Sequence, residues 1–209
     1  MIIKPQKTVF QTPVISFFFR LIARILMFCL GWRSKGSIHH LKKCVLIAAP
    51  HTSNWDLFYT LLVAFDLRTD IYWMGKDAIF RKPFGSIMKW LGGIPIDRSG
   101  SNNVVEQSIR MFEQNDRLVL TVPPSGTRSR VTCWKTGFYY IADGANVPIA
   151  LGFLDYRLKI GGIGPSIQTT GDIETDMKVI SSFYANITGK YPSNVSEAKV
   201  YIPPHDRAA

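Results

Sequence analysis

The sequence predicts an α/β fold in which helices flank a mostly parallel sheet, preceded by an apolar N-terminal helix. Short apolar runs alternate with segments of helical periodicity along most of the chain, and such alternation is typical of parallel sheets. The composition of 46% hydrophobic and 19% charged residues supplies a core and excludes a disordered chain. At 209 residues the chain suits one core. We divide it into an N-terminal helix with a basic connector (residues 1–43) and one folded domain (44–209).

Residues 14–32 are almost entirely apolar. As a helix this stretch would measure about 28 Å, close to the thickness of a bilayer core. Arg20 and Arg24 lie on one helical face near its middle, and each would cost roughly 2.5 to 3.5 kcal/mol at the bilayer centre, which disfavours a spanning helix. They also interrupt the apolar core, which together with the missing cleavage site disfavours a signal peptide.

An interfacial helix resolves this conflict, because apolar side chains then enter the acyl layer while the arginines meet lipid phosphates. The side chains expected to enter the acyl layer are Phe17, Phe18, Leu21, Ile25 and Phe28. We therefore expect a membrane-associating helix, peripheral or monotopic, at the cytoplasmic face of a membrane. Packing of this helix on the domain without membrane contact is an equally open alternative.

The first strand is predicted at 44–49, a continuous apolar run that ends at Pro50 and is typical of strands buried on both faces. The helix at 54–65 has apolar residues at helical spacing, with Ser53 or Asn54 placed to cap it. The same patterns predict a strand at 71–74, a helix at 83–91, a strand at 93–96, a helix at 103–115, a strand at 118–122, a helix at 135–144 and a strand at 147–153. Beyond residue 155 we expect a loop at 161–170 and an amphipathic helix at 172–189.

The chain contains 25 lysines and arginines against 15 acidic residues, and the net charge of +10 favours polyanionic partners. An anionic membrane surface fits better than nucleic acid. The aromatic residues are not interleaved with the basic ones, and no helix-turn-helix or zinc-finger spacing appears. We expect no nucleic-acid partner, and a basic nucleic-acid-binding domain stays as a rival interpretation.

The three cysteines, Cys29, Cys44 and Cys133, are odd in number and widely separated. They predict neither a disulfide framework nor a zinc site, and they fit a reducing compartment. His39 and His40 stand near Cys44 but have no second cysteine or carboxylate at ligand spacing. We expect no metal.

His51 falls at the carboxyl end of the first predicted strand, where reactive groups collect in open parallel sheets. Residues five apart in a continuous helix diverge by about 140° and cannot touch, so His51 must precede the helix that carries Asp56. The Asp56 carboxylate can then accept the Nδ1 hydrogen of the imidazole and leave Nε2 as a base toward a hydroxyl. Taken alone, the pair also fits a capping aspartate beside a surface histidine.

Four ordered motifs between residues 50 and 149 resemble those of one family, the glycerolipid acyltransferases, which includes bacterial lysophosphatidic acid acyltransferases. Residues 50–56 (PHTSNWD) resemble its first motif, x-H-x4-D. Its second block is similar to Lys76, residues 83–85 (PFG) and residues 92–98 (GGIPIDR). Residues 124–129 (PSGTRS) resemble the third motif, P-E-G-T-R-S, and residues 147–149 (VPI) the fourth.

The resemblance implies transfer of a fatty acyl group from acyl-CoA or acyl carrier protein to a hydroxyl of a lysophospholipid or glycerol-phosphate-type acceptor. His51 would act as the general base, oriented by Asp56, with no metal or organic cofactor. The acceptor hydroxyl itself is the nucleophile, so no acyl-enzyme is required. Backbone amides near the His51 loop, or at the helix N-terminus at Asn54, are candidates for stabilising the oxyanion.

Taken alone, the third motif fits a turn with one solvated arginine, but within the resemblance it has the chemistry of a phosphate site. Gly126 lets backbone amides approach an anion, and Thr127 and Arg128 donate hydrogen bonds to phosphate oxygens. We expect Arg98 and Arg128 to clamp the phosphate of the acceptor. Lys135, in a segment that also resembles the family, is expected to add charge to the same pocket.

One position departs from the family pattern, because Ser125 replaces the glutamate of the third motif. A serine still donates and accepts hydrogen bonds but supplies no negative charge. Ser125 also lacks the G-x-S-x-G context of a nucleophilic serine. The departure raises an alternative function, that of a weakly active or inactive lipid-binding member of the family.

Overall fold

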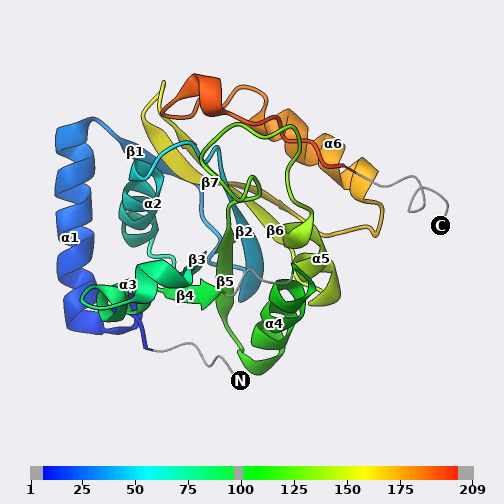
Figure 1. Ribbon diagram of the computed structural model, residues 1–209. Coiled ribbons are helices and arrows are strands. Elements are labelled where there is room, and N and C mark those ends of the chain that lie inside the picture. Colours follow the sequence, from blue (N-terminus) through cyan, green and yellow to red (C-terminus); the bar gives the residue numbers. More distant parts are fainter. Residues whose placement is uncertain (1–6, 97–100, 202–209) are drawn as a thin grey trace.

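The computed structural model describes residues 7–96 and 101–201, and in this part of the chain a seven-stranded sheet has the order β1-β7-β6-β2-β5-β3-β4 (Figure 1). The strands are β1 (Arg33–Lys35), β2 (Lys43–Ala49), β3 (Ile71–Lys76), β4 (Gly93–Ile96), β5 (Leu118–Val122), β6 (Ile149–Asp155) and β7 (Ile160–Ile167). Every neighbouring pair is parallel except β6 and β7. This arrangement confirms the predicted α/β fold with a mostly parallel sheet.

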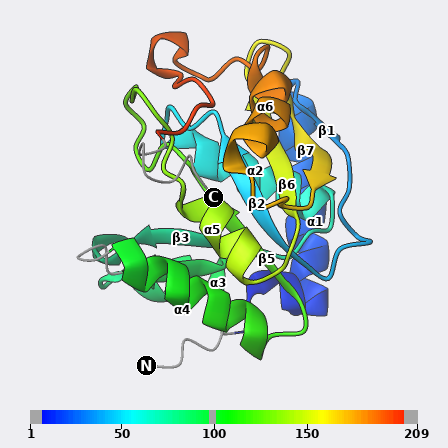
Figure 2. The same cartoon turned by 90° about the vertical axis from the view of Figure 1, so that its right-hand side faces the viewer.

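Helices cover both faces of the sheet and form two separate apolar cores with it. Helices α1 and α2 contribute to one core, and α4, α5 and α6 to the other. Figure 2 shows α4, α5 and α6 in front of the sheet, with α1 and α2 behind it. The helices are α1 (Pro13–Leu30), α2 (Trp55–Asp66), α3 (Gly85–Trp90), α4 (Ser101–Gln114), α5 (Gly137–Gly144) and α6 (Ile173–Tyr184), with short 3-10 turns at Val9–Gln11, Asp77–Phe80 and Pro192–Asn194.

Strand β2 lies in the middle of the sheet and is buried on both sides, as its continuous apolar run predicts. Val45 and Ile47 belong to the core under α4, α5 and α6, whereas Cys44 and Leu46 belong to the core under α1 and α2. Burial raises the pKa of the Cys44 thiol to about 12, so this cysteine packs as a small apolar side chain. The chain after β2 therefore leaves the sheet at the centre of its carboxyl edge.

The predicted loop at 161–170 is wrong, because these residues form most of strand β7, which is antiparallel to β6. The glycines of this segment weaken its strand pattern in the sequence. They are needed because neighbouring strands leave no room for a side chain. A Cβ on Gly162 would lie 2.1 Å from the carbonyl oxygen of Lys35 in β1. Strand β1 itself lies inside the segment that was expected to be a connector.

The last helix is shorter than predicted, since α6 ends at Tyr184 rather than at residue 189. The residues that follow leave the helix and run back across the carboxyl edge of the sheet. We call residues 188–200 the strap. The strap accepts a hydrogen bond from Tyr156 N through Thr188 O (2.9 Å), and Tyr191 N donates to Thr52 Oγ1 (3.3 Å).

Helix α1 packs on the domain along one face and leaves another apolar face exposed. Ser16, Ala23 and Met27 are buried. The exposed apolar side chains of α1 are Val14, Ile15, Phe17, Phe18, Leu21, Ile22, Ile25, Phe28 and Leu30. Arg24, expected to meet lipid phosphates, instead pairs with Asp66 of α2, with 2.8 Å between Nε and Oδ1. By length and composition, α1 is the one helix among residues 7–96 and 101–201 that qualifies as a membrane span.

Candidate active site

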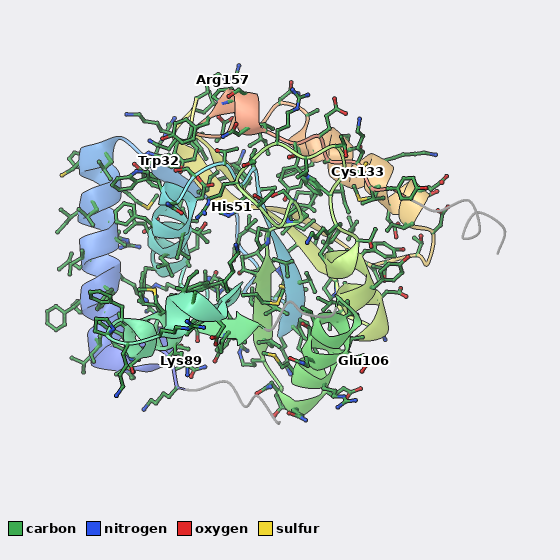
Figure 3. All side chains as sticks on the ribbon, in the orientation of Figure 1. Trp32, His51, Lys89, Glu106, Cys133 and Arg157 are labelled. Carbon is green, nitrogen blue, oxygen red and sulfur yellow. The ribbon has the colours of Figure 1, made fainter. Side chains whose placement is uncertain are left out.

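His51 lies on the loop between β2 and α2, at the carboxyl edge of the parallel sheet. In Figure 3 it appears near the centre of the molecule, between α2 and α6. Its imidazole is half-buried, with 24% of the side chain exposed. The strand before it is held by both β5 and β6, so the loop starts from a rigid base.

The structure brings His51 and Asp56 together as the spacing predicts. Nδ1 of His51 lies 3.1 Å from Oδ2 of Asp56. Asp56 sits in the first turn of α2, which begins at Trp55, so the histidine precedes the helix. Of the two predicted caps, Asn54 occupies the N-cap position but its side chain makes no capping hydrogen bond to the helix, while Ser53 Oγ accepts from Trp55 N (3.1 Å).

The Asp56 carboxylate accepts three further hydrogen bonds. The amides of Thr52 and Ser53 donate to Oδ2 at 2.7 and 2.9 Å, and the Tyr156 hydroxyl donates to Oδ1 at 2.7 Å. Burial alone raises the pKa of Asp56, but the hydrogen bonds from His51, Tyr156 and the two amides outweigh it and hold that pKa below its ordinary value. Because the carboxylate has no proton to donate, Nδ1 of His51 must be the donor and Nε2 is left as the basic nitrogen.

Tyr156 is a member of this network that sequence reasoning missed. Burial, and then the hydrogen bond to the charged Asp56, raise the pKa of its phenol far above the ordinary value, so the hydroxyl remains a donor. The residue lies 100 positions from Asp56 in the chain, and no local motif marks it. The sequence signal that could have identified Tyr156 is its position directly after β6. The carboxyl ends of β2 and β6 lie side by side, so a residue there is close to the His51 loop.

The amides of the His51 loop are largely occupied. Those of Thr52 and Ser53 donate to Asp56, and that of Trp55 donates to Ser53 Oγ. These three amides therefore orient the carboxylate and close the first turn of α2. These three amides are therefore not available to stabilise an oxyanion.

The third motif forms a loop after β5 beside His51. Ser125 is buried and donates to Thr127 O at 2.7 Å, and Gly126 has a φ of +65°, which a glycine adopts without strain. A Cβ on Gly126 would lie 3.1 Å from Cε of Lys135, so the lysine side chain lies directly over the turn. The loop thus brings Lys135 beside the motif.

The structure describes only one of the two arginines that were expected to clamp the acceptor phosphate. The Arg128 guanidinium donates to Oδ1 of Asn54 at the N-terminus of α2, which places it beside the His51 loop. Arg98, expected to share the clamp, lies outside the described residues. Groups of three or more metal-ligating side chains do not occur in the part of the chain that the structure describes.

An apolar cavity of about 210 Å³ opens beside His51 on the α2 face of the sheet. Its walls come from β2, α2, β3 and β6, and include Val63, Ile71 and Leu154. His51 and Arg128 also line it. The cavity therefore combines an apolar lining with the His51 imidazole and the Arg128 guanidinium.

A parallel α/β sheet with an oriented histidine beside an apolar cavity has the features of an acyl-transferring enzyme. A family model described as Acyltransferase matches residues 33–150, more than half of the chain. The chain therefore belongs to the acyltransferase family, as its four motifs predict.

A solved structure has the same fold, that of the 1-acyl-sn-glycerophosphate (LPA) acyltransferase PlsC from Thermotoga maritima. The two superpose with a TM-score of 0.56 at 14% sequence identity, over 81% of this chain and 76% of that one. No curated protein matches the chain at a significant level.

Replacing Tyr156 by phenylalanine is expected to raise the pKa of Asp56 and to lower stability at neutral pH. A carboxylate whose pKa is lower in the folded state stabilises the fold above its unfolded pKa, and this contribution is lost as the pH falls through the folded value. Loss of a hydrogen bond to a charged group costs about 1.5 to 3 kcal/mol. Denaturant unfolding at pH 7 should reveal this deficit for Tyr156→Phe, and the deficit should shrink in acid.

Tyr59→Phe is the matched control, because Tyr59 belongs to the same aromatic cluster as Tyr156, at 5.5 Å between ring centroids. Its unfolding free energy should follow the wild-type pH dependence. A Tyr156→Phe protein whose deficit stays constant from pH 7 to pH 3 would contradict the assigned role of the hydroxyl.

Proposed function

We propose that this chain transfers a fatty acyl group from acyl-CoA or acyl carrier protein to a hydroxyl of a lysophospholipid or glycerol-phosphate-type acceptor. The observation that carries the proposal is the His51–Asp56 contact of 3.1 Å between two residues that line the apolar cavity. The chemistry requires a base beside a site for an acyl chain, and the oriented histidine beside an apolar cavity supports this assignment. It requires no metal or organic cofactor.

In the proposed reaction Nε2 of His51 accepts the proton of the acceptor hydroxyl as its oxygen attacks the thioester carbonyl. The C–O bond forms, and the tetrahedral intermediate then expels the thiolate as the C–S bond breaks. The thiolate takes the proton back from the imidazolium, so the histidine returns to its starting state. The ionised Asp56 stabilises the imidazolium and keeps the ring in place.

Arg128 is the proposed partner of the acceptor phosphate. It lines the apolar cavity together with His51, so a phosphate on its guanidinium would hold the neighbouring hydroxyl close to the base. Lys135 lies over the Gly126 turn of the same loop and would add positive charge. Gly126 and Thr127 would supply the remaining hydrogen bonds.

The alternative, an inactive lipid-binding member, is motivated by Ser125. The serine is buried and bonded to Thr127 O, so it shapes the loop without providing a carboxylate. Thioester consumption with a panel of lysolipids separates the two functions. Binding without consumption would support the alternative.

We also propose that the exposed apolar face of α1 lies in the interface of an anionic membrane, at its cytoplasmic face. Phe28 is 86% exposed, and Phe17 and Phe18 are more than half exposed. The net charge of +10 attracts anionic lipid. The helix is held to the domain by its buried face and by the Arg24–Asp66 pair, which favours lying on the membrane over crossing it.

His51→Ala is expected to abolish acyl transfer, because it removes the proposed base. The fold should remain intact, because the imidazole is only half-buried and lies at the edge of the sheet. Asp56→Asn should lower the turnover number by about 10²- to 10⁴-fold, the range for loss of general-base catalysis. Release of free thiol from acyl-CoA with a lysolipid acceptor measures both. Full activity in folded His51→Ala protein would refute the mechanism.

Arg128→Ala should raise the KM of the acceptor roughly tenfold or more, because loss of a charge-assisted hydrogen bond costs about 1.5 to 3 kcal/mol. The KM of the thioester should change much less. Arg130→Ala is the matched control, an exposed arginine of the same loop that does not line the cavity. If only thioester binding suffers in Arg128→Ala, the phosphate assignment is wrong.

Replacing Phe18 and Phe28 together by glutamate should weaken binding to phosphatidylglycerol-containing vesicles at least about tenfold, since a buried phenylalanine contributes roughly 1.5 to 3 kcal/mol. Both residues are exposed, so the fold should be retained, which circular dichroism checks. Val179→Glu, an exposed apolar position on α6, is the control and should bind like the wild type. Equal flotation of all three proteins would exclude the interfacial helix.

A further inference from the structure

A second cavity, of about 520 Å³, touches His51 from the other face of the sheet. Its walls come from the end of α6, the strap and the loop after β5. The two cavities share only Ala49, Pro50 and His51 among the residues that line them. His51 therefore stands at the boundary between an apolar cavity under α2 and a separate one under α6.

The second cavity is a built part of the site, because the strap that forms its outer wall is fastened to both motif loops. Tyr191 N donates to Thr52 Oγ1 beside His51. On the other loop, Val131 N donates to Ser196 Oγ (2.9 Å) and Trp134 N donates to Lys199 O (2.7 Å). The cavity wall and the histidine thus belong to one hydrogen-bonded unit.

The serines of this cavity present mainly hydrogen-bond acceptors. The hydroxyls of Ser125, Ser181 and Ser182 donate to backbone carbonyls, at 2.7, 3.1 and 2.9 Å, so toward a ligand these three oxygens can act only as acceptors. Ser196 accepts from Val131 N and keeps its own proton to donate. A phosphate offers acceptors only and would find few donors here. A chain of amides, which carries N–H and C=O groups alternately, fits this set.

The charge of the cavity also favours an uncharged polar ligand such as a chain of amides. Its lining includes one cation, Lys199, and one anion, Glu197, paired at 2.6 Å between Nζ and Oε2. The cavity is therefore nearly neutral overall, in contrast to the loop that carries Arg128. An uncharged polar chain suits it better than a phosphate headgroup.

We propose that this cavity binds the pantetheine arm of the acyl donor, with the thioester beside His51 and the two amides of the arm against the serines of α6 and the strap. The inference rests on the proposed acyl transfer. A fatty acyl thioester of this kind is a linear molecule whose carbonyl lies between an apolar chain and an amide-bearing arm. Two cavities of those two characters that meet at the base hold such a molecule with its carbonyl at the histidine.

The test fills the cavity through Ala185→Phe, an exposed alanine at the end of α6 that lines it. Val179→Phe, an exposed site of α6 outside the lining, is the matched control. Kinetics compare two thioesters of the same fatty acid, that of CoA and that of ethanethiol, which has no amide arm. Titration calorimetry with free pantetheine gives a readout that needs no turnover.

We expect Ala185→Phe to raise the KM of the CoA thioester at least about tenfold, the factor for loss of one or two ordinary hydrogen bonds. The kcat/KM of the ethyl thioester should not change, and Val179→Phe should behave like the wild type with both donors. Pantetheine should bind the wild type and the control but not Ala185→Phe. An equal loss with both thioesters, or no loss with either, overturns the proposal.

Kinetics of the same variants with a fatty acyl carrier protein test whether CoA or the carrier protein supplies the pantetheine arm. Because CoA and the carrier protein present the same arm, Ala185→Phe must weaken whichever donor the wild type prefers, and an unaffected preferred donor overturns the site. If the wild type transfers no acyl group from any thioester, acyl transfer as the function fails. Pantetheine binding that Ala185→Phe abolishes would still support the site in that case, and its absence would overturn the site too.

Discussion

The buried negative charge of Asp56 is the constraint on which the rest of the site depends. A carboxylate removed from water is costly unless hydrogen bonds replace its hydration, and here four donors do so, from His51, Thr52, Ser53 and Tyr156. The same bonds fix the loop after β2, set the tautomer of the histidine and connect this loop to the chain after β6. Tyr156 is itself held by the strap. The hydrogen bonds that orient His51 therefore also connect separate parts of the fold.

The parallel sheet determines where these interactions meet. The ends of β2, β5 and β6 lie side by side, so the His51 loop, the third-motif loop and Tyr156 arrive at one edge although they are far apart in the sequence. Because β2 is central and covered on both faces, the loop after it has a cavity on each side. His51 therefore lines both cavities.

The sequence was sufficient for features that depend on local pattern. The continuous apolar run of β2 and the periodicity of α2 located both elements, and the spacing of His51 and Asp56 allowed the contact that the structure contains. Features set by distant contacts were missed. Strand β7 contains glycines because β1 approaches it closely, as the 2.1 Å clash at Gly162 indicates. Tyr156 acts across 100 residues, a distance over which local spacing carries no information.

Ser125, which stands where the family pattern has a glutamate, lines the cavity on only one side of His51. Ser125 lines the cavity under α6 and not the apolar one, and it takes no part in the hydrogen bonds of Asp56. A glutamate at this buried position would add a negative charge to a cavity whose charges otherwise cancel, in the Lys199–Glu197 pair. The serine leaves that cavity neutral and rich in acceptors. His51, Asp56 and Arg128 lie outside its contacts, so the substitution changes the lining of the α6 cavity and leaves the hydrogen bond between His51 and Asp56 as it is.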